Sequence, residues 1–198
     1  MKNILRESRI SNSEFIIKLP LTADLEKIRS EYEEFVSIGR YNCNNQLALK
    51  NRPNCEDVFL DGVGSLFDQK SKSFFAKESE FTEYNPYVGE YTKKIIRELE
   101  LSENVRFGRI RYMRLPPKTG LSVHYDMEAR YHLPIYTSPT SMICEYSGEA
   151  LAAKCYHIPE NGHFYIADTT RNHFVYNGSF EDRIHLVMCI DRSFDIYK

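Results

Sequence analysis

The C-terminal half of the chain consists of short segments with strand character, and this pattern limits the folds that the chain can adopt. From Val105 onward, the segments alternate polar with apolar residues or are rich in aromatic and β-branched side chains, and turn residues separate them. We expect strands near residues 105–114, 121–126, 130–136, 141–146, 154–158, 163–167, 173–177 and 183–190. No helical pattern intervenes, which argues against a parallel α/β sheet. The pattern predicts a double-stranded β-helix, the jelly-roll core of cupin-like proteins, or a related barrel.

The first 104 residues instead contain two amphipathic helix patterns. One covers residues 22–37 with Thr22 or Asp24 as its N-cap, and the other begins at Asn85-Pro86 and runs to Leu101. Their apolar residues recur at three- and four-residue steps: Leu25, Ile28, Tyr32 and Phe35, then Val88, Tyr91, Ile95 and Leu99. Between the two helices, the short apolar pieces of residues 46–66 predict loops and one or two strands. We therefore predict a single domain, 1–198, mainly β with flanking helices. In it, a mostly helical lead-in, 1–104, packs on a jelly-roll core, 105–198.

Composition and charge argue against several classes of protein. The chain has 198 residues, is 42% hydrophobic and 27% charged, and carries a formal net charge of -2, so we expect no nucleic-acid or membrane partner. The N-terminus turns polar after five residues, without the apolar core of a secretory signal. Five cysteines without a CxxC pair indicate neither a zinc knuckle nor a disulfide framework. These features predict a soluble protein of the reducing cytoplasm.

Two residues of one predicted strand, His124 and Asp126, are suited to binding a metal ion. Side chains two positions apart on a strand point to the same side, so both can reach one ion while Tyr125 points away. His173 begins a later predicted strand, and a barrel can bring it back to this pair. Two imidazoles and one carboxylate are the pattern of non-haem Fe(II) sites that react with O2. Otherwise, His124 and Asp126 would form a surface ion pair and His173 would be a hydrogen-bonded core histidine.

Arg183 is the second informative residue. Alternation along residues 183–190 places Arg183, His185 and Val187 on one face, and on the other Ile184, Leu186, Met188 and Ile190. A guanidinium inside a barrel is costly unless it is paired, and the carboxylate of a ligand is a natural partner. The alternative is an arginine at a strand end that reaches solvent, Glu181 or Asp182.

Three blocks in the region from Arg111 to Asp191 stand in a specific order. They are His124-Tyr-Asp126, then Arg130-Tyr-His132-Leu-Pro-Ile, then His173-Phe-Val-Tyr-Asn177 followed by Asp182-Arg183-Ile-His-Leu-Val. Together they resemble the aspartyl/asparaginyl β-hydroxylase family of Fe(II)- and 2-oxoglutarate-dependent oxygenases.

The resemblance implies that His124, Asp126 and His173 are the metal ligands and the catalytic centre, and that the metal is Fe(II). It also implies that Arg183 pairs with the distal carboxylate of 2-oxoglutarate, the co-substrate. The protein would then be a dioxygenase that uses O2, decarboxylates 2-oxoglutarate to succinate and hydroxylates an amino acid or an amino-acid side chain of the Asp, Asn or Pro type. Its substrate would be a small molecule or a peptide.

Arg130 and His132 match the RxH element of the family, which the resemblance implies helps to hold the co-substrate. Animal members that modify proteins lack the carboxylate ligand, whereas this chain has Asp126. In this respect it resembles the bacterial-type branch, which includes hydroxylases of small amino acids such as proline.

Three further residues are candidates for contact with the substrate. Arg109 and Arg111, on the strand before the metal-binding pair, would meet a substrate carboxylate. Tyr125 would line the cavity or, like other tyrosines of the strands, fill the core. Residues 42–73 are the expected place for a lid.

Two other classes of function fit parts of this pattern. A non-catalytic cupin-like metal-binding or sensing module would keep the barrel, but it has no need of three ligands beside an anchor such as Arg183. A zinc hydrolase would use the same ligands with a bound water. No general base for it is evident, and Arg130, His132 and Arg183 would have no role in it.

Overall fold

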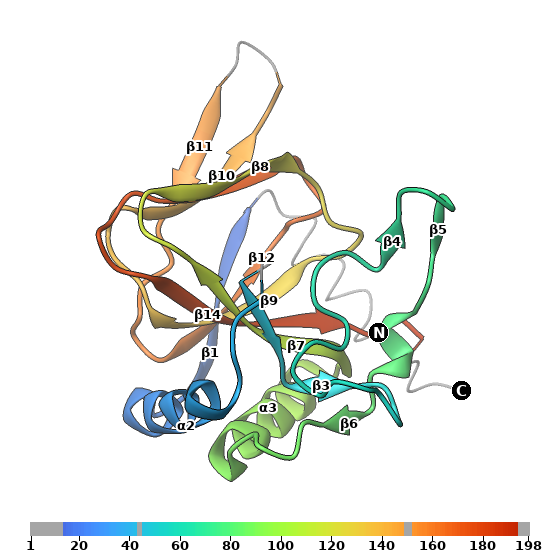
Figure 1. Ribbon diagram of the computed structural model, residues 1–198. Helices are drawn as coiled ribbons and strands as arrows, with labels where there is room; N and C mark the ends of the chain where they lie inside the picture. The colour runs from blue at the N-terminus through green and yellow to red at the C-terminus, as the bar shows by residue number, and fades with distance from the viewer. Residues whose placement is uncertain (1–13, 43–44, 149–151, 194–198) are drawn as a thin grey trace.

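The computed structural model of the chain describes residues 14–42, 45–148 and 152–193. Its centre is a sandwich of two antiparallel sheets (Figure 1). The major sheet has the order β1 (Ile16–Thr22), β12 (His163–Ala167), β9 (Arg130–Tyr136), β14 (Arg183–Ile190), β7 (Phe107–Leu115) and β2 (Gln46–Ala48). The minor sheet has the order β11 (Ala153–Tyr156), β10 (Ser141–Tyr146), β13 (His173–Asn177) and β8 (Thr119–His124).

From β7 onward, successive strands alternate between the two sheets, except that β10 and β11 form a hairpin. This is the connectivity of a double-stranded β-helix, so the predicted fold class is confirmed. All eight strands expected from the sequence are present, and five of them have the expected bounds: β9, β10, β12, β13 and β14.

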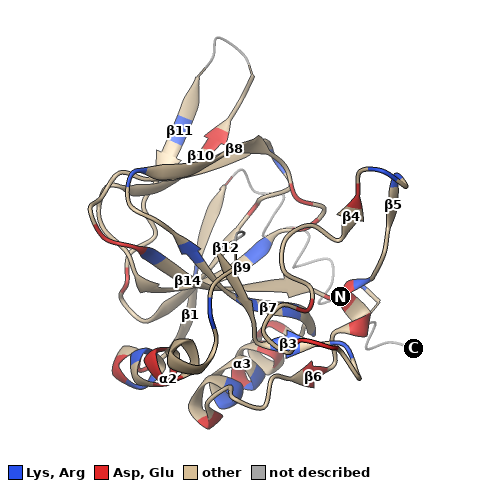
Figure 2. Ribbon diagram, in the orientation of Figure 1, with Lys and Arg blue, Asp and Glu red and all other residues tan. Residues whose placement is uncertain are grey.

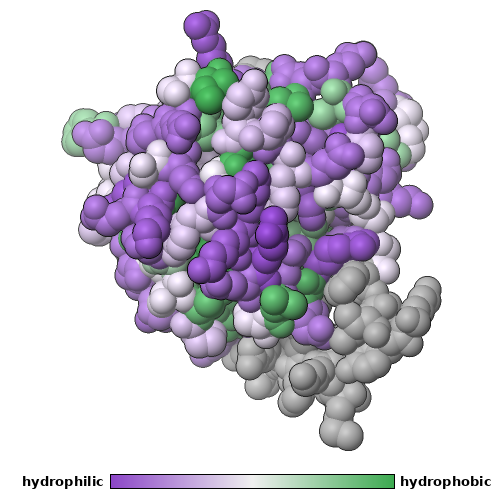
Figure 3. All heavy atoms as spheres, turned by 90° about the horizontal axis from the view of Figure 1, so that it is seen from below, coloured by the Kyte–Doolittle hydropathy of each residue, from purple (hydrophilic) through white to green (hydrophobic). Residues whose placement is uncertain are grey.

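Two helices cover the outer face of the major sheet (Figure 1). Helix α2 (Leu25–Ile38) begins after Asp24, whose side chain accepts hydrogen bonds from the backbone of Glu26 and Lys27, as expected for an N-cap. It buries Ile28, Tyr32 and Phe35 against the sheet. Seen from the helix side, the molecule is mainly hydrophilic (Figure 3).

Helix α3 (Glu90–Glu103) begins later than the Asn85-Pro86 start predicted from the sequence. The Asn85 side chain bonds the carbonyls of Ala48 and Val58 and accepts from the backbone N–H of Tyr87, which holds this segment in a turn. The helix begins where the Glu31 carboxylate accepts from the backbone N–H groups of residues 91 and 92. A carboxylate from another helix therefore caps α3.

The N-terminal segment contributes strands as well as helices: β2 and β3 (Lys50–Asn51) lie within residues 46–66, where the sequence predicts one or two strands, whereas it does not predict β1. β1 pairs with β12 at one edge of the major sheet, and β2 pairs with β7 at the other. Both cover an edge strand that would otherwise present unpaired backbone groups. Residues before 105 are thus part of the β core.

The two faces of β14 have different surroundings, as the alternation in the sequence predicts. Ile184, Leu186, Met188 and Ile190 pack with the helices in the larger apolar cluster. Arg183 and Val187 instead line the space between the two sheets. A smaller apolar cluster fills only part of this space, and the rest is a cavity.

Smaller elements surround one end of the sandwich. β3 pairs with β6 (Glu83–Tyr84), β4 (Phe67–Asp68) pairs with β5 (Ser73–Phe74), and the 3-10 helix η1 (Glu78–Glu80) lies beside β7. Among the helices in the described part of the chain, none has the length and hydrophobicity needed to span a membrane.

One expectation about the cysteines is wrong. Cys144 and Cys155 face each other across β10 and β11 and form a disulfide. The sequence contains no CxxC pair, but strand pairing brings these two residues together although eleven positions separate them. Cys55 and Cys189 are free thiols.

Candidate metal centre

His124, Asp126 and His173 lie together between the sheets at one end of the sandwich. His124, the last residue of β8, is the direct pairing partner of His173, the first residue of β13, and their ring centroids are 4.3 Å apart. Asp126 follows β8, and its backbone N–H donates to the carbonyl of Thr169. One possible ligand atom from each of the three residues lies within 4.8 Å of the other two. The strands therefore bring the three predicted residues to one point.

Both imidazoles leave the same nitrogen free for a metal. Nδ1 of His124 lies 2.7 Å from the carbonyl of Ser122, and Nδ1 of His173 lies 3.0 Å from that of Arg171. A carbonyl only accepts, so each Nδ1 carries the proton and each Nε2 keeps its lone pair. Burial lowers the pKa of His173, which favours the neutral, ligating form.

Asp126 is held as a carboxylate by Arg130. Nε and Nη2 of Arg130 donate to the two oxygens of Asp126 at 3.1 and 3.0 Å. Burial alone would raise the pKa of Asp126, but the charge and hydrogen bonds of Arg130 lower it to about 2. Nη1 of Arg130 also contacts Sγ of Cys189. In this structure Arg130 therefore contacts the candidate ligand Asp126, whereas the resemblance assigned it to the co-substrate.

Arg183 points into the interior. Its side chain is buried, and Nη2 donates to Nδ1 of His185 at 3.1 Å. Neither Glu181 nor Asp182 forms an ion pair with it. Asp182 lies 3.6 Å from Arg114 instead. Burial lowers the pKa of Arg183 to about 10, so the guanidinium is charged at neutral pH, and no described acidic residue forms an ion pair with it. This buried charge fits an acidic ligand.

His132 and His185 lie next to this guanidinium. Their Nδ1 atoms are 3.4 Å apart, and neither Nε2 has a hydrogen-bond partner within the described ranges. Burial, with the charges of Arg183 and Arg130, lowers the pKa of His132 to about 3, so it is neutral at physiological pH. Of these two histidines, His132 lines the same cavity as Arg183, whereas His185 is fully buried behind it.

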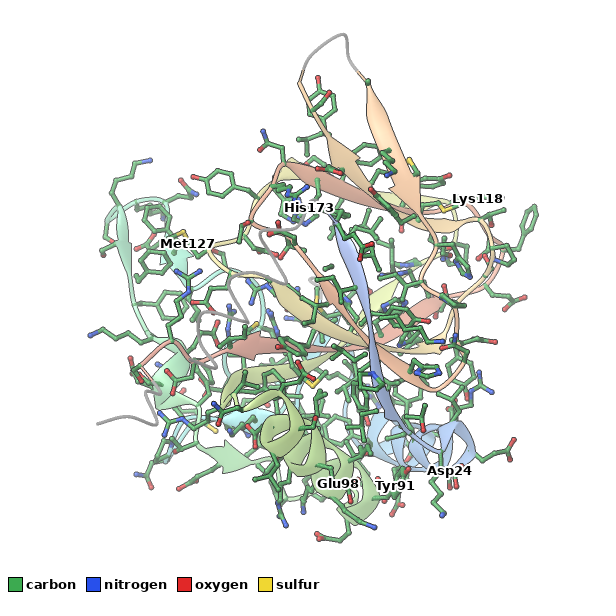
Figure 4. The ribbon with its side chains drawn as sticks, turned by 180° about the vertical axis from the view of Figure 1, so that it is seen from behind. Asp24, Tyr91, Glu98, Lys118, Met127 and His173 are labelled. Carbon is green, nitrogen blue, oxygen red and sulfur yellow. A yellow bond between two sulfur atoms is a disulfide. The ribbon has the colours of Figure 1, made fainter. Side chains whose placement is uncertain are left out.

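A cavity of about 1060 Å³ connects these groups. His124, Asp126, His173 and Arg183 all line it. Basic positions, blue in Figure 2, occur on the strands of the major sheet, and among them Arg111 and Arg130 also line the cavity. In the view from behind, Met127 lies between His173 and the β4–β5 hairpin (Figure 4). The site is therefore a pocket between the two sheets that is large enough for more than one small ligand.

The structure places the three candidate substrate residues differently. Arg109 donates to Glu78 at 2.8 Å and to the carbonyls of Gly62 and Gly64, so its charge is already paired. Arg111 lines the cavity and has no acidic partner among the described residues. Tyr125 is 65% exposed at the cavity mouth. Part of the predicted lid region, residues 64–67 and 69, also lines the cavity.

Sequence reasoning missed two residues of the site, Glu78 and Cys189. Cys189 continues the inward-facing series of Arg183, His185 and Val187, so strict alternation along β14 would have identified it. Glu78 lies in a short 3-10 helix without a periodic pattern, and its contact with Arg109 forms only in the folded chain.

Comparisons with known proteins agree with this geometry. The profile of the family described as aspartyl/asparaginyl beta-hydroxylase matches residues 22–193. A search of curated proteins found no match.

Among solved structures, an oxidoreductase of the 2OG-Fe(II) oxygenase family from Burkholderia pseudomallei has a TM-score of 0.57 at 10% identity, over 96% of this chain and 88% of that one. A Pseudomonas putida prolyl-4-hydroxylase also has a TM-score of 0.57 at 10% identity, over 97% and 99%. HygX from Streptomyces hygroscopicus, with nickel and 2-oxoglutarate bound, has a TM-score of 0.55 at 10% identity, over 96% and 87%.

These similarities to solved structures concern the fold, whereas the family match covers the sequence from before α2 to the end of the described residues. The chain therefore belongs to the aspartyl/asparaginyl β-hydroxylase family of Fe(II)- and 2-oxoglutarate-dependent oxygenases.

Proposed function

We propose that the protein hydroxylates an amino acid, or an amino-acid side chain of the Asp, Asn or Pro type, with His124, Asp126 and His173 as the ligands of Fe(II). Two neutral imidazoles with free Nε2 atoms and one ionised carboxylate are a ligand set that suits this ion. Arg183 would bind the distal carboxylate of 2-oxoglutarate, because it is buried and charged and has no ion pair among the described residues.

Bound Fe(II), with 2-oxoglutarate and O2, supplies oxidative decarboxylation of the co-substrate to succinate and insertion of one oxygen atom into a C–H bond of the substrate. The residues of the chain position the reactants for this chemistry. Carbonyl groups at positions 122 and 171 orient the two imidazoles, Arg130 keeps Asp126 ionised, and Arg183 fixes one end of the co-substrate.

The single observation that carries the proposal is one cavity that contains both the three convergent ligand atoms and the buried Arg183, which has no acidic partner among the described residues. A non-catalytic binding module would not need this second feature. The substrate would be a small molecule or a peptide, since the cavity of about 1060 Å³ has room for it beside the co-substrate, and Phe67, Phe74 and Tyr125 are among its lining residues.

The test is to load the purified protein anaerobically with Fe(II), add 2-oxoglutarate and O2, and measure succinate over a panel of amino acids and short peptides. We expect one substrate class to stimulate succinate release and to gain an oxygen atom from labelled O2. Asp126→Ala is the control and should lose both metal affinity and turnover. An absence of 2-oxoglutarate binding, or unchanged metal affinity in Asp126→Ala, would contradict the proposal.

A further inference from the structure

Two buried guanidinium groups in the cavity have no acidic partner among the described residues, and the proposed function uses only one of them. Arg183 is the first. Arg111 is the second: it is 4% exposed, and its polar contacts are with Gln46, the carbonyl of Gly64 and Sγ of Cys189. A buried charge without a counter-ion destabilises a protein, so a second group of this kind also requires an explanation.

One molecule of 2-oxoglutarate, bound as proposed, would not satisfy both arginines. The guanidinium of Arg183 is held at His185 and that of Arg111 at Cys189, four positions further along β14. Four residues of strand span about 13 Å. The two carboxylates of 2-oxoglutarate are joined by four carbon–carbon bonds of about 1.5 Å each. Under the proposed function, the carboxylate that does not pair with Arg183 would lie at the metal. Arg111 is therefore available for a different anion.

The side of the Arg111 guanidinium that binds carboxylates best is almost unused. Nη1 donates to Oε1 of Gln46 at 2.9 Å, and Nη2 contacts only a weak acceptor, Sγ of Cys189, at 3.2 Å. Nε is buried and has no partner within the described residues. In Arg130, the equivalent pair of atoms, Nε and Nη2, binds both oxygens of Asp126. A ligand carboxylate would make the same bidentate contact with Arg111.

Arg111 also lies close to the candidate metal ligands. Sγ of Cys189 contacts both Arg111 and Arg130, and Arg130 in turn binds Asp126. A carboxylate bound to Arg111 would thus lie one arginine away from the candidate ligand Asp126. Burial lowers the pKa of Arg111 to about 10, and the positive charges of Arg109 and Arg130 contribute to this lowering. Positive charge therefore gathers around Arg111, and an anionic ligand would offset it.

We propose that Arg111 binds a carboxylate group of the substrate, so that the protein selects substrates that carry a free carboxylate near the carbon to be hydroxylated. This inference rests on the proposed function. A free amino acid and the C-terminus of a peptide offer the same group. The rest of the substrate would extend toward the mouth, where Phe67, Phe74, Tyr125 and Met127 provide apolar surface.

Binding without turnover provides the first test. The protein is loaded with Ni(II) and 2-oxoglutarate, and its melting temperature is measured with free amino acids, their amides, and short peptides with free or amidated C-termini. We expect at least one free acid to raise the melting temperature and its matched amide to have no effect. Free amino acids and peptide acids are separate arms, so the result identifies which source of the carboxylate the site accepts.

Variants of Arg111 provide the second test. Arg111→Gln should lose the shift produced by the acid while keeping the shifts produced by Ni(II) and by the co-substrate, and Arg111→Lys should keep part of it. In the Fe(II) enzyme, Arg111→Gln should raise the KM for the acid about 10- to 100-fold, the effect of losing charge-assisted hydrogen bonds, and should change the KM for the co-substrate less than about twofold. Arg97→Gln, on the exposed face of α3, is the matched control and should behave as wild type.

The outcomes separate the two proposals. If the protein binds 2-oxoglutarate but no free acid is preferred over its amide, or if Arg111→Gln binds acids as well as wild type does, the role of Arg111 is wrong while the proposed function stands. If Arg111→Gln instead loses 2-oxoglutarate, Arg111 belongs to the co-substrate site and the inference also fails. If wild type does not bind 2-oxoglutarate at all, the proposed function itself fails.

Discussion

Asp126 and Arg130 form the ion pair that sets the charge of the candidate metal site. Arg130 donates to both oxygens of Asp126 and lowers its pKa to about 2, against the effect of burial. Protons therefore do not compete for this carboxylate until strongly acidic pH. The pair also fixes the orientation of the carboxylate relative to the two imidazoles, and such supporting contacts affect metal affinity.

Replacing Arg130 by Gln should weaken metal binding about 10- to 100-fold, the usual effect of removing a group that supports a metal ligand. Without the guanidinium, the pKa of Asp126 rises, so the loss of affinity should be larger at pH 5 than at pH 7.5. Titration calorimetry with Ni(II) at both pH values measures this. Equal affinities of wild type and Arg130→Gln at pH 5 would contradict the role given to Arg130.

Replacing Arg183 by Met should affect the co-substrate and not the metal. The guanidinium is buried and charged, and it lies on the major sheet, away from the ligand-bearing strands β8 and β13. We expect the KM for the co-substrate to rise at least about tenfold, as the loss of a charged hydrogen bond implies. Ni(II) affinity, measured in parallel, should stay within about twofold of wild type, since no metal ligand changes. A parallel loss of metal affinity would show that Arg183 acts through the fold.

At the scale of elements, η1 is joined to β7 by a buried ion pair. Arg109 donates to Glu78 through its backbone N–H and its side chain, and the two side chains are 6% and 14% exposed. The same guanidinium holds the carbonyls of Gly62 and Gly64. This pair thus positions the segment that forms one wall of the cavity.

Glu78→Gln should destabilise the fold by about 3–5 kcal/mol at neutral pH, because it leaves Arg109 buried without its counter-ion. Burial alone would raise the pKa of Glu78, but the charge and hydrogen bonds of Arg109 outweigh it and hold the pKa below its usual range. The stabilisation is therefore complete above the unfolded pKa of about 4.3 and is lost as pH falls through the folded pKa.

Urea unfolding of wild type and Glu78→Gln between pH 7 and pH 3 measures both effects. The difference in free energy of unfolding should be largest at pH 7 and should shrink in acid. A difference that does not change with pH would show that the glutamate acts by packing alone. Lys94→Gln, on the exposed side of α3, is a suitable surface control.

The strands that sequence predicts well differ from the others in the regularity of their polar–apolar alternation. The strands from β7 to β14 have turn residues between them and regular alternation, so sequence alone predicts their positions. β1, which the sequence does not predict, contains Pro20 and buries only Leu19 fully, so it shows no clear period of two. β2 has three residues, so sequence predicts a strand within residues 46–66 but not its bounds. Such edge strands form because β12 and β7 offer unpaired backbone groups, which is a property of the assembled sheet.

In the site, too, features that follow from local strand geometry are predictable, whereas contacts that depend on strand order are not. His124 and Asp126 are two positions apart on one strand, so their shared direction follows from local geometry. The contacts of Arg130 and Arg111 with Cys189 join residues 59 and 78 positions apart and depend on strand order. The resemblance identified Arg130 as a site residue, but only the folded chain shows that it contacts Asp126.

At the scale of the whole molecule, the site lies between two sheets with different roles. All three candidate ligands belong to β8, the residues after it, and β13, which are parts of the minor sheet. Arg183 and Arg111 belong to β14 and β7 of the major sheet. A co-substrate bound to both the metal and Arg183 would therefore connect the two sheets.

Hydrogen exchange should show this connection in two steps. Ni(II) alone should slow amide exchange in β8 and β13, and 2-oxoglutarate should extend the protection to β14 because binding stabilises the elements that hold the ligand. Mass spectrometry of peptic fragments resolves these strands. Protection by 2-oxoglutarate that stays within the minor sheet would contradict the placement of the co-substrate at Arg183.

The bond between Cys144 and Cys155 has a consequence outside the site. It joins β10 to the edge strand β11, whereas His173 lies on β13, on the opposite side of β10. Reductant should therefore lower thermal stability and leave metal affinity unchanged. Since such bonds persist in oxidising compartments and are rare in the cytosol, alkylating the thiols in intact cells before extraction would reveal, from the state of this one pair, which environment the protein occupies.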